Sequence, residues 1–272
     1  MRNDFITALK QNKIEKKEYR WNIAVTVLTL FLIGSILNIP FSREVKRLNI
    51  EAGLNNVRLN ESIFEDFFAV GISSLIIGVI IIFVGLWVSE RANLGAPLIA
   101  SIFSKQSFKE LIDIKAVLSS IILAILTALL LLGLFELQKE FYPVASKMAR
   151  PTKDFYALVS FSAGITEEII FRLGLMSLII TANQFFRKKE NPSSKIIWSG
   201  IFISALFFGL VHLPLSKNFV ELTSFSVGVT MFGNLITGSV FGWIFWKQGL
   251  LVAIISHIVF DLVFHVIGSP FG

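Results

Sequence analysis

Long apolar runs alternate with shorter polar segments along the chain. Each run approaches the ~20 residues that a helix needs to cross the hydrocarbon core of a bilayer. Backbone groups in lipid must pair within their own segment, so these runs predict helices. We expect seven spans, with most basic residues in the segments between them. The expected spans are residues 21–39, 67–88, 116–137, 155–180, 196–213, 225–246 and 250–267.

Proline and polar residues set the expected boundaries. Pro40 is expected to end the first span and Pro214 the fifth, because proline lacks the N–H that a helix interior needs. Residues 41–66 and 138–154 are expected to be loops outside the membrane, the first with room for a short helix. Residues 89–115 have a Gly-Ala-Pro break and amphipathic pieces, which favours a segment along the membrane interface and leaves an eighth span open.

Composition supports a membrane protein. The 272 residues are 54% hydrophobic and only 16% charged, whereas soluble domains have about 25% charged residues. There is no cysteine, which excludes disulfides, thiolate metal sites and a cysteine nucleophile. The predicted fold class is all-α, a polytopic helical membrane protein with about seven to eight transmembrane helices. We expect a basic N-terminal segment at 1–20 and a single integral membrane domain at 21–272.

The net charge is +6, and its distribution indicates the surroundings of the chain. Basic residues cluster between the spans, which favours loops beside anionic lipid over binding of nucleic acid. If the N-terminus is placed in the cytoplasm, the segments on the cytoplasmic side contain more Lys and Arg than those on the outer side. This bias favours a cytoplasmic N-terminus. We therefore expect a multi-pass protein of the cell membrane, the prokaryotic cytoplasmic membrane in particular, with no nucleic-acid partner.

Three ionisable residues, Glu167, Glu168 and Arg172, lie in the fourth span. A charge near the centre of a membrane helix costs about 2.5–3.5 kcal/mol, so these groups need pairing, neutralisation or hydration. Glu168 and Arg172 stand at i and i+4 on one helix face, the order that an ion pair prefers. Glu167 points about 100° away and is left to face a polar cavity, where one of the two carboxylates could act as a general base. The alternative is a buried salt bridge that only fixes helix packing.

Polar residues also interrupt the later apolar spans. His212 ends the fifth span four residues after Phe208, so the two side chains share a face. His257 and Asp261 stand at i and i+4 in the seventh span. Such groups are expected in separate spans only if they converge. His265, one turn later, is expected to be a core histidine instead.

The sixth span combines small residues with one amide. Gly238 and Gly242 form a small-xxx-small face, which predicts close approach of another helix. Asn234 lies on the same span and is expected to make an interhelical hydrogen bond.

A carboxylate, two imidazoles and an aspartate in a wet pocket suit attack of water on a carbonyl group. A glutamate helped by one histidine would deprotonate the water, and the second histidine with its neighbour would stabilise the oxyanion. No G-x-S-x-G motif is present for a serine nucleophile. The same residues have donors for zinc or another divalent metal, although H-E-x-x-H is absent, so a metal-dependent protease stays an alternative.

Three motifs in order give a resemblance to a known family. E-E-x-x-x-R at 167–172, F-x-x-x-H at 208–212 and H-x-x-x-N/D at 257–261 resemble those of the CAAX prenyl protease and bacteriocin-processing family (CPBP, or Abi) of intramembrane endopeptidases. The resemblance covers about residues 155–261 of an expected core at 155–267. It implies helices enclosing a catalytic cavity, no cofactor, and a peptide or membrane-protein substrate in the lipid bilayer.

The resemblance also implies a role for each motif residue. Glu167 and His212 would activate water, Glu168 and Arg172 would support them, and His257 with Asp261 would form the oxyanion site. Members that cleave CAAX substrates often have asparagine where this chain has Asp261. An aspartate donates to an oxyanion only when it is protonated, so Asp261 could instead orient His257 or keep it cationic. Two further alternatives are a non-catalytic binding, immunity or regulatory protein on this fold, and a transporter or proton relay.

Overall fold

The computed structural model describes residues 18–54, 62–103, 113–188 and 191–268. Within these ranges the chain is helical, and its single β pairing is an isolated bridge between Ser146 and Val220. The helices are α2 (Arg20–Leu37), α3 (Ile39–Glu51), α4 (Ile63–Arg91), α5 (Pro97–Phe103), α7 (Ile114–Phe141), α8 (Lys153–Glu167), α9 (Ser177–Phe186), α10 (Ser194–Phe219), α11 (Ser224–Gln248) and α12 (Leu250–Asp261), with π-helical segments η1 (Glu168–Met176) and η2 (Leu262–Ile267).

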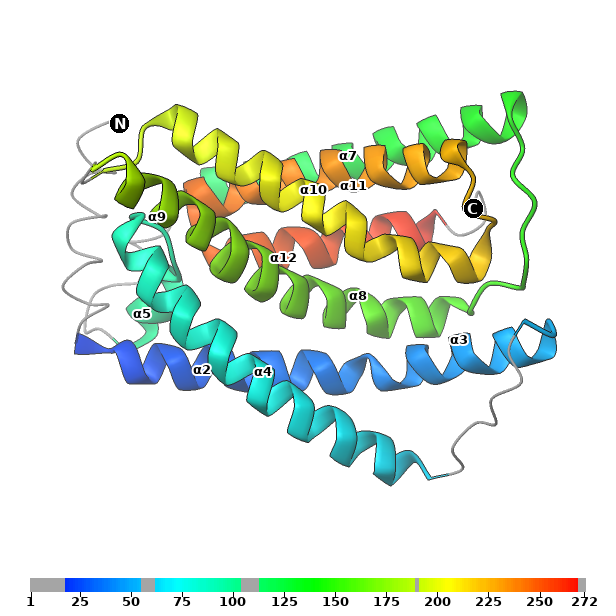
Figure 1. Cartoon of the computed structure of the whole chain (residues 1–272), viewed down its shortest axis with the longest axis horizontal. Coiled ribbons are helices and arrows are strands. Elements are labelled where there is room, and N and C mark those ends of the chain that lie inside the picture. Colours follow the sequence, from blue (N-terminus) through cyan, green and yellow to red (C-terminus); the bar gives the residue numbers. More distant parts are fainter. Residues whose placement is uncertain (1–17, 55–61, 104–112, 189–190, 269–272) are drawn as a thin grey trace.

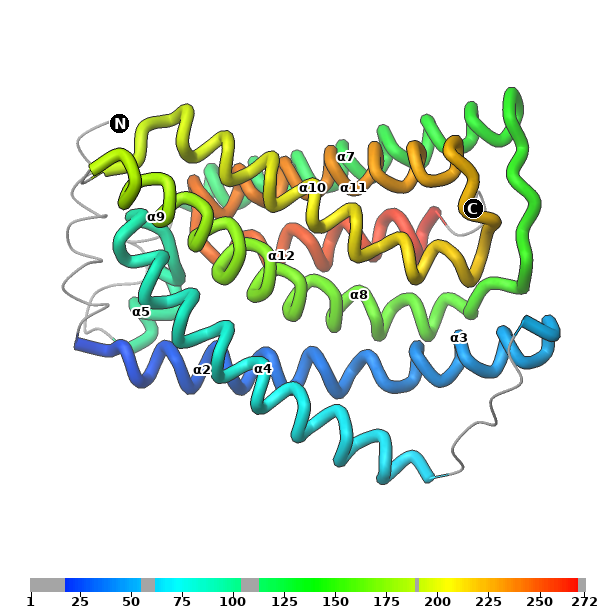
Figure 2. The backbone as a smooth tube through the Cα atoms, in the orientation of Figure 1, coloured from blue at the N-terminus to red at the C-terminus, as the bar shows by residue number. Residues whose placement is uncertain are grey.

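Seven continuous helices in the described residues are long and apolar enough to cross a membrane, with α2–α3, α8–η1–α9 and α12–η2 each counted as one. The prediction of an all-α polytopic membrane protein is confirmed. Figures 1 and 2 show α2, α7, α8, α10, α11 and α12 running broadly along the long axis of the molecule, whereas α4 crosses α2 obliquely. Helix α8 packs against α2 and α12, and α12 packs against α7 and α11. The helix with the acidic pair therefore has protein neighbours on several sides.

Helix α4 lies at the outside of the bundle. Only 17% of its apolar window is buried, against 44% for the helix that contains α8. Its exposed side chains are large and apolar, which suits contact with lipid and not with water. They include Phe64, Phe68, Ile72, Ile76, Ile80 and Trp87.

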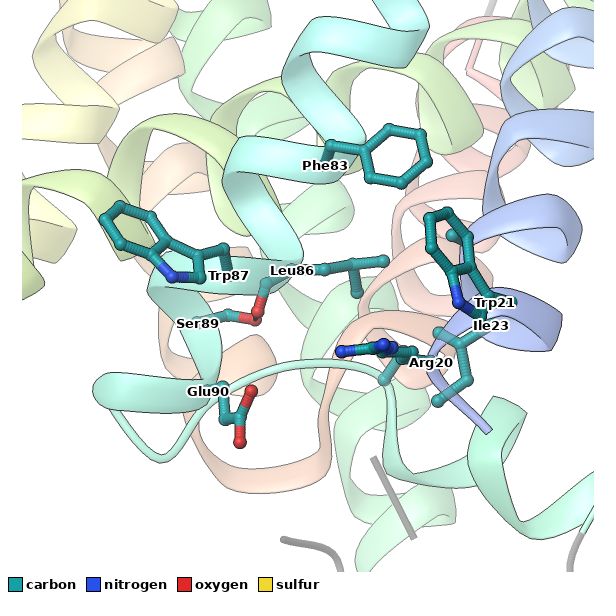
Figure 3. A pocket seen from close by; sticks show the side chains of 10 residues that line it. Arg20, Trp21, Ile23, Phe83, Leu86, Trp87, Ser89 and Glu90 are labelled. Carbon is teal, nitrogen blue, oxygen red and sulfur yellow. Dashed lines mark hydrogen bonds between the residues drawn. The ribbon is translucent and has the colours of Figure 1, made fainter. Parts of the chain in front are cut away.

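Tryptophan gathers at one end of the bundle, where α2 and α10 begin and α4 and α11 end. Trp21 and Phe83 make an edge contact with ring centroids 5.6 Å apart, and the Arg91 guanidinium lies over the Trp87 ring. Figure 3 shows Trp21, Phe83 and Trp87 around a groove of about 290 Å³ between α2 and α4, with Arg20 beside it. Tryptophan with basic residues is typical of a membrane–water interface, so we expect this end of the bundle to lie at one membrane surface.

Glycines bring α10 and α11 into close contact, as their spacing predicts. A Cβ at Gly242 would lie 3.1 Å from the Ile201 side chain, and a Cβ at Gly238 would lie 2.8 Å from Ala205 Cβ. The two contacts join positions four residues apart on each helix. They therefore set the register of α10 against α11.

Replacing Gly238 by alanine is expected to lower the stability of the protein by about 1–3 kcal/mol, because the new methyl group would also lie 2.9 Å from the Ala205 backbone. Thermal unfolding in detergent measures the change. Gly228→Ala on the same helix is the matched control, since a Cβ there has no atom within 4 Å and alanine favours helix. Equal midpoints for the two variants would contradict the prediction.

Two helix ends differ from the sequence prediction. The chain continues as α3 beyond Pro40, because proline in a first helical turn loses an N–H that has no partner there anyway. Helix α10 runs through Pro214 to Phe219, although proline removes one backbone hydrogen bond. Pro40 therefore carries no such cost, and tertiary packing outweighs the cost at Pro214, so the helical chain passes both prolines and both expected ends were wrong.

The segments between spans are also more helical than predicted. Much of 41–66 is helix, as α3 and the start of α4. Helix α5 buries Leu98, Ile99 and Ala100 and packs against α2 and α12. Its expected place along the membrane interface stays a prediction. No eighth span occurs in the described part of the chain. The rest of the predicted interfacial segment, 104–112, and most of the basic segment, 1–17, lie outside the described residues.

Candidate active site

A cavity of about 510 Å³ lies among α7, α8, α10, α11 and α12. Four predicted site residues line it: Glu167, His212, His257 and Asp261. The other two, Glu168 and Arg172, are fully buried beside it. All six residues therefore come together from three membrane helices. The cavity extends to Lys139, Ser146 and Val220, in or just beyond the last turns of α7 and α10. Figure 1 shows these two helices ending on the side of the bundle opposite to the starts of α2 and α10.

Glu168 has a partner at each carboxylate oxygen. Its Oε1 accepts a hydrogen bond of 2.9 Å from His257 Nδ1, and its Oε2 lies 3.3 Å from Arg172 Nε. The Arg172 guanidinium also lies over the Phe208 ring, 5.0 Å from its centroid. The Glu168–Arg172 pairing agrees with the i, i+4 spacing. The partnership with His257, 89 residues away, follows only from the fold.

Glu167 lies between the two imidazole rings. Its Oε1 is 3.7 Å from His212 Nε2, and its Oε2 is 3.8 Å from His257 Nε2. Both distances exceed a direct hydrogen bond, and a water molecule can bridge such a gap. The Glu167 and His212 side chains are each 24% exposed, in contrast to the fully buried Glu168. Of the two acids, Glu167 is therefore the one that solvent in the cavity can reach.

One hydrogen bond fixes the tautomer of His212. Its Nδ1 lies 2.7 Å from the backbone oxygen of Phe208, one turn earlier in α10. A carbonyl oxygen can only accept, so Nδ1–H donates and a neutral ring carries its lone pair on Nε2. That lone pair is on the nitrogen nearer Glu167. The F-x-x-x-H spacing thus orients the imidazole through the backbone as well as through ring contact.

His257 is held by Glu168 and by stacking. Its ring lies 4.3 Å from the Phe241 ring at an interplanar angle of 20°. Asp261 Oδ2 lies 3.7 Å from His257 Nε2, too far for a hydrogen bond. Glu168, and not Asp261, therefore orients the His257 ring. Asp261 lies beside the nitrogen that faces the cavity.

The acidic motif enters a π-helical segment, η1, which the sequence did not predict. Two serines add hydrogen bonds to its carbonyls: Ser177 Oγ donates to Arg172 O at 3.0 Å, and Ser204 Oγ of α10 donates to Phe171 O at 2.9 Å. Interruptions of this kind inside α-helices are frequent at functional sites. We find no signal in the sequence that would have revealed it.

Some residues near the cavity differ from expectation. Asn234 Nδ2 donates to Thr230 O of its own helix at 2.9 Å, so the predicted interhelical bond was wrong; an amide can instead reach the carbonyl four residues earlier. Thr230 and Thr237 line the cavity with it and were not predicted. Their spacing on one helical face was the available signal. His265, predicted to be a core residue, stacks on Tyr156 at 5.1 Å and also lines the cavity.

The zinc alternative needs a set of donor side chains. Among the described residues, no group of three or more His, Asp or Glu side chains is placed to hold a metal ion. Of the carboxylates described above, Glu168 is already held by His257 and Arg172. Their arrangement does not fit a metal site, and we derive no step through one.

Residues 154–263 match the family described as type II CAAX prenyl endopeptidase Rce1-like. The matched region runs from α8 to the start of η2 and contains all six predicted site residues. Neither the comparison with curated proteins nor that with solved structures gave a match.

Proposed function

We propose that this chain, whose residues 154–263 match the Rce1-like family of type II CAAX prenyl endopeptidases, is an intramembrane glutamate-type endopeptidase in which Glu167 and His212 activate water. The observation that supports this mechanism is the placement of the Glu167 carboxylate within 4 Å of the Nε2 atoms of both His212 and His257. A water molecule between Glu167 and His212 would have an acceptor on each side.

In the proposed reaction, Glu167 takes a proton from the water molecule while the water oxygen forms a bond to the carbonyl carbon of the peptide. His212 Nε2 accepts a hydrogen bond from the second water hydrogen and orients the attack. The C–N bond then breaks, and Glu167 returns the proton to the leaving nitrogen. The products are a carboxylic acid and an amine, and the side chains end as they began.

His257 is proposed to stabilise the oxyanion. With Nδ1–H bound to Glu168, a protonated ring would present Nε2–H to the cavity. Arg172 balances the charge of Glu168 and so supports this arrangement. The mechanism uses side chains alone and needs no cofactor.

The proposed substrate is an extended segment of a membrane-associated peptide or membrane protein. Leu131, Leu132, Phe135 and Phe264 give the cavity a large apolar wall, which suits apolar side chains. We place the protein in a prokaryotic cytoplasmic membrane, where a peptide precursor, a signal molecule or a membrane protein is a more suitable substrate than a prenylated protein.

Purified protein in vesicles of phosphatidylethanolamine and phosphatidylglycerol is expected to cleave an internally quenched apolar peptide, and to retain that activity after treatment with EDTA. A second peptide with a farnesylated cysteine tests prenyl dependence. Loss of activity in EDTA with recovery on addition of zinc would favour the metal-dependent alternative. Failure to cleave either peptide would contradict the proposed function.

A further inference from the structure

Helix α11 gives the cavity a polar wall. Thr230, Asn234 and Thr237 lie on one helical face, and all three line the cavity together with Glu167 and His212. Thr237 Oγ1 donates to Gly233 O within its own helix, so its hydroxyl hydrogen is already used. The polar groups on this wall therefore differ in what they can offer to a substrate.

The register of α10 against α11 brings Asn234 level with the histidine motif. Gly238 faces Ala205, and Ser216 Oγ lies 3.4 Å from Thr230 Oγ1. Between these two contacts, a Cβ at Gly209 would lie 3.5 Å from Asn234 Cβ. Gly209 follows Phe208 directly and precedes His212 by three residues. Asn234 consequently packs against the helical turn that orients His212.

Asn234 has unused hydrogen-bonding capacity. A side-chain amide has two N–H donors and a carbonyl oxygen. One donor is used by Thr230 O; among the described residues the second N–H and Oδ1 have no hydrogen-bond partner. The residue is partly exposed and lines the cavity, so these groups can meet a bound molecule.

The proposed reaction needs a second donor for the oxyanion. His257 Nε2–H supplies one, but an ionised Asp261 can only accept hydrogen bonds. Phe208 contacts both the His257 ring and the Asn234 face of α11. The ring centroids of Phe208 and His257 are 6.1 Å apart. The Phe208 Cδ1 atom would lie 3.5 Å from a Cβ at Gly238, which is one helical turn beyond Asn234. We propose that the Asn234 amide binds the carbonyl oxygen of the scissile peptide bond and donates to the oxyanion, an inference that rests on the proposed function.

Asn234→Asp keeps the shape of the side chain and removes the donor. The kcat of this variant is expected to fall by about 10²–10³-fold with little change in KM, which is the usual effect of removing one oxyanion donor from an enzyme. Asn234→Leu serves as a second variant without a new charge, and thermal unfolding checks that both fold. Thr237→Val is the matched control on the same wall, and it should retain the wild-type kcat.

A rescue experiment separates a donor from a packing residue. Asp261→Asn places an amide beside His257 Nε2, so adding it to Asn234→Leu should restore part of the lost kcat. Three results would each overturn this inference. The first is wild-type kcat in the two folded Asn234 variants, and the second is a raised KM with unchanged kcat. The third is no increase in kcat when Asp261→Asn is added to Asn234→Leu. If one of these results is found and the wild-type protein still cleaves the peptide, only the role of Asn234 is overturned and the proposed function is kept. A wild-type protein that cleaves neither peptide overturns both.

Discussion

Replacing Glu167 by glutamine is expected to lower kcat by at least about 10²–10⁴-fold, the usual contribution of a general base. Glutamine has nearly the same shape but cannot take a proton from water. The measurement is cleavage of the quenched peptide by the reconstituted variant, with thermal unfolding to show that the fold is kept. Glu136→Gln is the matched control, because Glu136 also lines the cavity but forms an exposed ion pair with Lys139.

Full function in the Glu167→Gln variant would contradict the proposed mechanism and favour the binding, immunity or regulatory alternative. The same variant gives access to the natural substrate. In cells that carry it, the uncut peptide or protein is expected to accumulate relative to cells with the wild-type chain. Comparison of the membrane peptides of the two strains by mass spectrometry would identify it.

Replacing Glu168 by leucine is expected to destabilise the protein by about 3–5 kcal/mol, because Arg172 would be left fully buried without its counter-charge. His257 would also lose its acceptor. Adding Arg172→Met should recover much of the stability, since an apolar pair can replace a buried ion pair. Both the single and the double variant should be inactive. Unfolding in detergent provides the measurement.

The control for that pair is Glu44→Gln. Its partner Arg47 is 45% exposed, so the loss should be much smaller than that of Glu168→Leu. A Glu168→Leu/Arg172→Met protein no more stable than Glu168→Leu alone would contradict the prediction.

The sequence predicted best where the energetic cost is large. Charged groups in apolar spans are costly, so the convergence of Glu167, His212 and His257 could be inferred from their positions alone. Local chain-breaking signals were less reliable: α3 accommodates Pro40 in its first turn without losing a hydrogen bond, and packing outweighs the one hydrogen bond that Pro214 removes from α10. Partners from distant segments, such as His257 for Glu168, could not be assigned, since several spans present compatible groups. The catalytic roles of these residues stay predictions.

The π-helical segment η1 has a geometric consequence for the whole fourth span. In a helix of uniform pitch, the rotational setting of one end dictates that of the other. Before η1, α8 packs on α2 and α12; after it, α9 packs on α4 and α10. The wider winding of η1 lets α8 and α9 differ in their rotation about the helix axis. Glu167 can thus point into the cavity while Thr181, fourteen positions later, donates a hydrogen bond to the Val88 carbonyl of α4.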